Sequence, residues 1–152
     1  MTDGTRHNEK RRIVRLGVGD YEALLKLWQE CGLTSLRPQG RDSPRAFAKQ
    51  LECGQIVLGL AADGELIASV IVTHDCRKGW INRLVVHPAR RRRGLGKALI
   101  EEAEKVLCER GFKVVAALIE DWNESSLSLF QSRGYSKHED ILYLSKRGDP
   151  DA

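Results

Sequence analysis

The stretch Arg91-Arg92-Arg93-Gly94-Leu95-Gly96 decides the fold of this chain, because it joins two segments of different periodicity. Before it, residues 80–86 form an apolar run typical of a strand; after it, residues 95–110 carry apolar side chains at helical spacing. The first turn of a helix has four backbone N–H groups without intrahelical partners and the positive end of the helix dipole. Because glycine lets the backbone approach a ligand closely, this junction predicts a phosphate-binding site.

The segments around this junction predict a single α/β domain over residues 11–147, with a mixed, mostly antiparallel sheet of six to seven strands and about four helices. Residues 1–10 are expected to be frayed, and 148–152 to form a short tail. Strands are expected over 12–16, 55–61, 65–74, 80–87, 114–119 and 141–144. Helices are expected from the N-cap Asp20 to Gly32, after the N-cap Ser43, over 95–110 and over 124–133.

The continuously apolar run 114–119 indicates a strand that is buried on both faces. Residues 80–119 therefore predict a βαβ crossover with two parallel strands at the centre of the sheet.

Composition narrows the class of protein. The chain has 152 residues, a net charge of +4 and four cysteines, with no Cys/His spacing that would indicate a metal site. The N-terminus has no apolar signal core, so we expect a cytoplasmic protein with reduced thiols. The longest apolar run, 56–62, is too short to span a bilayer, and the modest positive charge suits a small anionic ligand at least as well as a nucleic acid.

Two common nucleotide-binding loops do not fit the junction. The Walker A loop needs a hydroxyl residue after its lysine, but Ala98 follows Lys97, and no glycine stands five residues before Gly96. The dinucleotide fingerprint needs a small residue three positions after Gly96, where this chain has Leu99.

A different family fits both this junction and a second motif. The chain has Leu84-Val85-Val86-His87-Pro88-Ala89-Arg90-Arg91-Arg92-Arg93-Gly94-Leu95-Gly96, which is similar to Leu-x-Val-x-Pro-x-x-Arg/Gln-x-x-Gly-x-Gly/Ala. Further along, Asn123, Ser126, Phe130, Gly134 and Tyr135 follow the spacing of the second motif. On these two motifs, and on the order of elements over residues 12–146, the chain resembles single-domain members of the GNAT superfamily of N-acetyltransferases.

This resemblance implies acetyl-CoA as cosubstrate, no metal, and transfer of its acetyl group to a primary amine on a small molecule or peptide. It implies that the strand before the loop and the strand 114–119 splay apart to admit the pantetheine arm. The expected catalytic residues are Val86, whose backbone N–H would stabilise the oxyanion, Glu120 and Tyr135. The expected cofactor-binding residues are Leu84, Val85, Val86, Arg91, Arg92, Arg93, Gly94, Leu95, Gly96, Lys97, Asn123, Ser126 and Phe130.

The chain departs from the family at two positions. Phe130 stands where many relatives have a tyrosine as general acid, and Leu118 where some have a glutamate as base. Tyr135 and Tyr143 are alternative acids, and Glu120 and the neighbouring Asp121 alternative bases, although each also suits a purely structural or solvated role.

The departures keep a second function open: a GNAT fold that senses acyl-CoA with little turnover. A nucleic-acid binder is disfavoured, because the arginines cluster in one loop. The acceptor is expected to contact residues 21–53 and 136–143. Arg37 and Arg41 either favour an acidic acceptor or are ordinary exposed loop residues, and the protein is expected to be a monomer or a homodimer.

Overall fold

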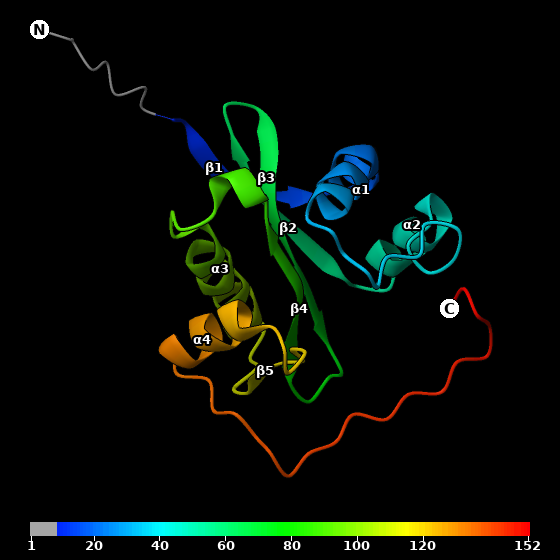
Figure 1. Ribbon diagram of the computed structural model, residues 1–152, viewed down its shortest axis with the longest axis vertical. Coiled ribbons are helices and arrows are strands. Elements are labelled where there is room, and N and C mark those ends of the chain that lie inside the picture. Colours follow the sequence, from blue (N-terminus) through cyan, green and yellow to red (C-terminus); the bar gives the residue numbers. More distant parts are fainter. Residues whose placement is uncertain (1–8) are drawn as a thin grey trace, which may run out of the picture.

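A single five-stranded sheet forms the centre of the protein in a computed structural model that describes residues 9–152 (Figure 1). Consecutive strands are neighbours, so the first four make an antiparallel meander, and the fifth pairs in parallel with the fourth. The strands are β1 (Arg11–Leu16), β2 (Ile56–Ala62), β3 (Glu65–His74), β4 (Gly79–Val86) and β5 (Val115–Ala117).

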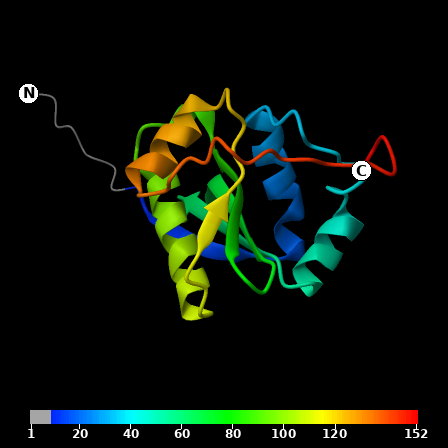
Figure 2. The ribbon, with the colours of Figure 1, turned by 90° about the horizontal axis from the view of Figure 1, so that it is seen from below.

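Helices cover both faces of the sheet (Figure 2). On one face lie α1 (Tyr21–Glu30) and α2 (Pro44–Glu52), and on the other α3 (Leu95–Glu109) and α4 (Glu124–Ser132). The larger apolar cluster lies between the sheet and α3, whose Leu95, Leu99, Ala103 and Leu107 are each at most 3% exposed. These residues recur every four positions and so share one face of the helix, as the sequence predicts.

The starts of the helices follow the sequence signals. The Ser43 hydroxyl accepts a hydrogen bond from the Ala46 N–H at 3.2 Å, and Pro44 occupies the first helical position of α2. Asp20 is the N-cap of α1, but its carboxylate binds the Gly17 N–H at 2.8 Å instead of the helix, because residues 18–20 form a 3-10 turn. None of the described helices is long and apolar enough to cross a membrane.

The predicted crossover is present, but its second strand is shorter than expected. The parallel ladder joins only Gly79–Ile81 of β4 to Val115–Ala117 of β5. The expectation of burial on both faces is wrong, since Val114 is 54% exposed and Leu118 is 55% exposed. Only Val115, Ala117 and Ile119 pack against the cluster beneath α3, so one face of this segment lacks a covering layer.

The expected strand 141–144 is absent, so the sheet has five strands and not six to seven. After α4 the chain runs as an irregular segment away from the sheet and toward α2 (Figure 1). Leu142 is 82% exposed and Leu144 is 89% exposed. An apolar run becomes a strand only where a neighbouring strand supplies its hydrogen bonds, and this segment has no such neighbour among the described residues.

Candidate functional site

The edge of β4 that faces β5 is unpaired over residues 82–86. The ladder to β5 stops at Ile81, and no other described strand lies on that side. The His87 N–H donates to the Ile67 carbonyl of β3 at 2.8 Å. Because the polar groups of successive strand residues point in alternate directions, the Val86 N–H points to the unpaired edge. An extended ligand can therefore add to β4 here as a further strand.

A basic loop that suits an anion follows the end of this edge. Arg92 and Gly94 have φ values of 63° and 75°, so the backbone adopts the left-handed conformation at two positions just before α3 begins. The first helical hydrogen bond runs from the Ala98 N–H to the Gly94 carbonyl at 3.1 Å. Among the described residues, the backbone N–H groups of 92–97 donate no hydrogen bond. Such a run of free donors at a helix N-terminus binds anions such as phosphate.

One arginine of this loop is structural. Arg90 pairs with the Glu9 carboxylate and lies 3.8 Å from Glu65. Arg11 also binds Glu9, at 3.0 Å, and its hydrogen bond is the main reason why the pKa of Glu9 is lowered. The prediction of a frayed N-terminus is therefore wrong for Glu9; residues 1–8 lie outside the described part of the chain. Arg90 thus forms ion pairs within the protein, and the exposed Arg93 also lies 3.9 Å from Glu9. Arg91 and Arg92 have no ion-pair partner among the described residues.

Those three arginines, Arg91, Arg92 and Arg93, are all exposed, and Lys97 follows on the first turn of α3. The Arg91 side chain reaches back to the Val86 carbonyl at 3.4 Å. It also lies near Cys31 at the end of α1; burial raises the pKa of this thiol, and the Arg91 charge offsets only part of the rise. Arg91 thus connects the basic loop with the unpaired edge of β4.

Gly96 and Leu95 contribute to this site through their backbone alone. Leu95 is 3% exposed in the core. A Cβ atom on Gly96 would lie 3.0 Å from the Leu129 side chain of α4 and 3.8 Å from Leu84 and Val86 of β4. Glycine therefore lets α3 approach α4 and the sheet closely, while the N–H groups of both residues stay available to a ligand.

Asn123 and Ser126 form the start of α4. The Asn123 side-chain oxygen accepts a hydrogen bond from the Ser126 N–H at 3.2 Å, so Asn123 is the N-cap of this helix. Its side-chain NH₂ group remains for a ligand. Contact of either residue with a cosubstrate stays a prediction.

Phe130 and Tyr135 pack against each other at the far end of α4. Phe130 is 4% exposed, and its ring meets that of Tyr135 edge-on at 5.0 Å. The Tyr135 hydroxyl donates to Glu104 of α3 at 2.9 Å, and burial is the main cause that raises its pKa. That hydroxyl is therefore engaged by Glu104 and releases its proton less readily, and a catalytic role for Tyr135 stays a prediction.

The comparison with protein families identifies the family of this fold. The sequence profile of the acetyltransferase (GNAT) family matches residues 21–135. The chain belongs to the GNAT family. It is 30% identical over 128 residues to acetyltransferase SG1711 of Sodalis glossinidius (strain morsitans), covering 84% of this chain and 89% of that protein.

Solved GNAT structures share the fold. PaiA N-acetyltransferase of Thermoplasma acidophilum, in complex with coenzyme A, has a TM-score of 0.76 at 20% identity, over 87% of this chain and 93% of its own. Ribosomal-protein-S18-alanine N-acetyltransferase of Escherichia coli has a TM-score of 0.73 at 22% identity, over 85% of this chain and 79% of its own. At these identities the likeness extends to the fold alone.

The candidate site has an exposed carboxylate beyond β5. Glu120 follows the strand, and its backbone carbonyl accepts a hydrogen bond from the Asn123 N–H at 3.0 Å. Leu118, which stands where some GNAT relatives have a glutamate, is 55% exposed and offers no polar group. The role of Glu120 as a base stays a prediction.

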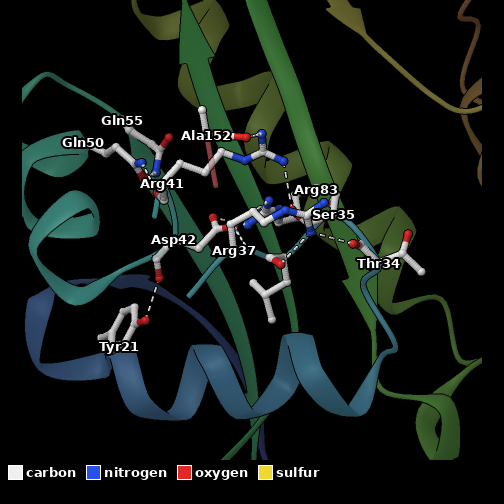
Figure 3. A network of polar contacts seen from close by, with 11 residues as sticks. Tyr21, Thr34, Ser35, Arg37, Arg41, Asp42, Gln50, Gln55, Arg83 and Ala152 are labelled. Atoms are coloured by element: carbon white, nitrogen blue, oxygen red, sulfur yellow. Dashed lines mark hydrogen bonds and ion pairs between the residues drawn. The ribbon is translucent and has the colours of Figure 1, made fainter. Parts of the chain in front are cut away.

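On the α1 side of the GNAT site lies an ion pair that the sequence patterns did not indicate (Figure 3). Arg83 of β4 has a φ of 47°, and its guanidinium binds Asp42 at 2.7 Å and lies 4.7 Å from the Trp28 ring centre. Asp42 is 7% exposed and also accepts the Arg37 N–H at 2.8 Å. The Tyr21 hydroxyl donates to the Asp42 carbonyl at 2.6 Å. The sequence predicted a helix N-cap at Ser43, next to Asp42, but it gave no role to the Asp42 side chain and none to Arg83.

Proposed function

We propose that this GNAT protein transfers the acetyl group of acetyl-CoA to a primary amine by direct attack of the amine on the thioester. One observation carries the proposal: the unpaired edge of β4 ends at a loop whose backbone N–H groups at 92–97 have no acceptor among the described residues. An extended arm along the edge and a pyrophosphate on the loop match the two ends of coenzyme A.

Each residue group has a separate role in binding. The backbone of Leu84, Val85 and Val86 pairs with the pantetheine arm, and the N–H groups from Arg92 to Lys97 hold the pyrophosphate. The exposed side chains of Arg91, Arg92, Arg93 and Lys97 add charge around it. The side-chain NH₂ group of Asn123 binds the arm from the side of α4.

The cosubstrate supplies an activated thioester, and the chain positions the reactants. The Val86 N–H, free on the unpaired edge, donates to the carbonyl oxygen on which negative charge develops. Binding of both reactants on one edge converts the reaction into an effectively unimolecular step. Glu120 is the proposed acceptor of the amine proton, while the C–S bond of the thioester breaks and coenzyme A leaves as its thiolate, which takes a proton from solvent.

A second candidate function is an acyl-CoA sensor with little turnover. One observation favours it: Phe130, which is 4% exposed, stands where many relatives have a tyrosine as general acid. The hydroxyl of the nearby Tyr135 already donates a hydrogen bond to Glu104. On this alternative, coenzyme A binds at the same residues but the thiolate leaves without assistance from a side chain.

An acetyl-transfer assay over a panel of primary amines separates the two functions. All four cysteines are free thiols and Cys53, Cys76 and Cys108 are exposed, so thiol-reactive dyes would report the protein itself. The products are therefore separated by chromatography and identified by mass. We expect acetyl-CoA to raise the melting temperature and at least one amine to be acetylated. Stabilisation without acetylation of any amine would favour the sensor. If acetyl-CoA did not stabilise the protein and no amine were acetylated, both functions would be refuted.

A further inference from the structure

The loop between α1 and α2 carries more positive charge than the described residues neutralise. The side chains of Arg37, Arg41 and Arg83 converge on it, and the single carboxylate among them, Asp42, is bound by Arg83 at 2.7 Å (Figure 3). The Arg37 guanidinium donates to the Thr34 carbonyl at 3.0 Å and the Leu36 carbonyl at 2.9 Å. The Arg41 guanidinium donates to the Ser35 and Ala152 carbonyls, both at 2.9 Å. Within the described part of the chain, neither Arg37 nor Arg41 forms an ion pair with the side chain of an Asp or Glu.

This loop flanks the reactive edge of β4. Arg83 precedes Leu84–Val86 on the strand, and its ion pair with Asp42 fastens the loop to that point. The end of α1 is fastened nearby, because the His87 side chain contacts Glu30 at 3.1 Å. A molecule that presents an amine to the unpaired edge from the α1 side therefore passes the free N–H groups of Arg37 and Arg41.

An acidic segment of the chain itself lies on this loop. Residues 149–152, which include the carboxylates of Asp149 and Asp151, run back to it, and the Ala152 carbonyl accepts a hydrogen bond from Arg41 (Figure 3). The contact is close, because a Cβ atom on Gly40 would collide with the Asp151 carbonyl oxygen. Arg147 also donates to the Ala152 oxygen, at 3.0 Å. The loop thus already contacts, through backbone oxygens, a segment that carries two carboxylates.

From these contacts we infer that the acceptor is an amine that carries a carboxylate, which Arg37 and Arg41 bind in the place that residues 149–152 occupy. The inference rests on the proposed acetyl transfer. A guanidinium binds a carboxylate through two parallel charge-assisted hydrogen bonds, whereas a neutral amine gains nothing from these side chains. The acidic segment competes with the acceptor, so its displacement strengthens acceptor binding.

Matched amines that differ by one carboxylate test the acceptor class. The probes are the tripeptide amides Asp-Ala-Ala-NH₂ and Asn-Ala-Ala-NH₂, together with the α-amide of aspartate and the diamide that corresponds to it, so that peptide and small-molecule acceptors are distinguished. We expect kcat/KM to be higher for the acidic member of at least one pair by about tenfold or more, mainly through KM, on the scale of one charge-assisted contact. Equal values within both pairs would overturn the inference and leave acetyl transfer itself intact.

Variants of the loop test which residues provide the preference. Arg41→Gln removes the charge and the terminal nitrogens that bind the Ser35 and Ala152 oxygens but keeps a polar side chain, and we expect it to lower the acidic preference severalfold. Arg45→Gln, which removes an exposed arginine on the first turn of α2, is the matched control and should retain the preference. An unchanged preference in Arg41→Gln would contradict the assignment.

Gly40→Ala tests the competing segment in the full-length chain. Its new methyl group displaces the Asp151 carbonyl, so KM for the acidic tripeptide should fall severalfold while KM for the neutral one stays constant. An unchanged KM, with thermal melting showing an intact fold, would refute competition. Should no amine be acetylated, calorimetric titration of both tripeptides into the protein saturated with coenzyme A still decides the inference, since equal affinities would refute it.

Discussion

A charge placed at Gly94 tests whether the basic loop holds the pyrophosphate of coenzyme A. Gly94 is the N-cap of α3 and has a φ of 75°, a conformation that Asn and Asp adopt more readily than other non-glycine residues. No atom lies within 4 Å of a Cβ placed on Gly94, so a short side chain fits without a collision. Gly94→Asp therefore adds a negative charge beside the free N–H groups while the fold is kept.

The expected loss of affinity follows from Coulomb's law. Two unit charges about 5 Å apart interact by about 3 kcal/mol at an effective dielectric constant of about 20, and by less than about 1 kcal/mol in bulk water. The loop is exposed and lies between these limits, so we expect a loss of about 2 kcal/mol, or about 30-fold in the Kd of coenzyme A. Isothermal titration calorimetry at low and high salt measures it, and the loss should shrink as salt screens the charges.

Gly94→Asn is the matched control, because it has nearly the same shape and tolerates the same backbone conformation without the charge. Its affinity for coenzyme A should stay within a few-fold of wild type. Acetyl-pantetheine, which lacks the pyrophosphate, should bind both variants and the wild type alike. Equal affinity of the Asp and Asn variants for coenzyme A would refute the assignment of the pyrophosphate to this loop.

Three further substitutions probe the α4 side. Asn123→Ser keeps an N-cap acceptor but removes the NH₂ group, and calorimetry should show coenzyme A binding weakened by about 1–2 kcal/mol with an unchanged melting temperature. Phe130→Tyr places a hydroxyl in a core position that is 4% exposed. The free protein should lose about 1–2 kcal/mol of stability, seen as a lower melting temperature. An unchanged melting temperature with faster turnover would instead place the ring at the thioester. The pKa of Tyr135 is raised in the folded state, so the free energy of unfolding of the wild type should decline as pH rises above the unfolded-state pKa of about 10. In thermal melts at about pH 8 and about pH 10.5, Tyr135→Phe should lose less stability than the wild type.

The elements that the sequence predicted correctly are those whose signals are local. The helical spacing of apolar residues over 95–110 and the Ser43-Pro44 N-cap need no distant partner, and the structure has both α3 and the start of α2 there. The GNAT resemblance, carried by residues 84–96 and 123–135, is confirmed by the family match over 21–135. Local spacing therefore sufficed for the crossover and for the position of the loop between β4 and α3; phosphate binding by that loop stays a prediction.

The elements that the sequence missed depend on neighbours far along the chain. The apolar runs 114–119 and 141–144 both suggest strands, but a strand extends only as far as its partner does. Pairing with β4 supports only Val115–Ala117, and 141–144 has no described partner. The pair of Arg83 and Asp42 is separated by 41 residues, and its charges are indistinguishable in the sequence from those of exposed residues.

The bulge in β4 connects the missed ion pair to the site. Asn82 pairs with Ile71 of β3 and Val85 pairs with Ser69, so Arg83 and Leu84 together face a single residue. A left-handed φ on a residue such as Arg83 costs on the order of 1–3 kcal/mol and persists only where surrounding contacts hold it. The ion pair with Asp42 and the stacking on Trp28 supply those contacts. Because a bulge bends and twists its strand, β4 turns away from the line of β5 just after their last paired residue, Ile81. The bulge at Arg83 thus lies where the pairing of β4 with β5 ends, next to the unpaired edge and the Val86 N–H on which the proposed chemistry depends.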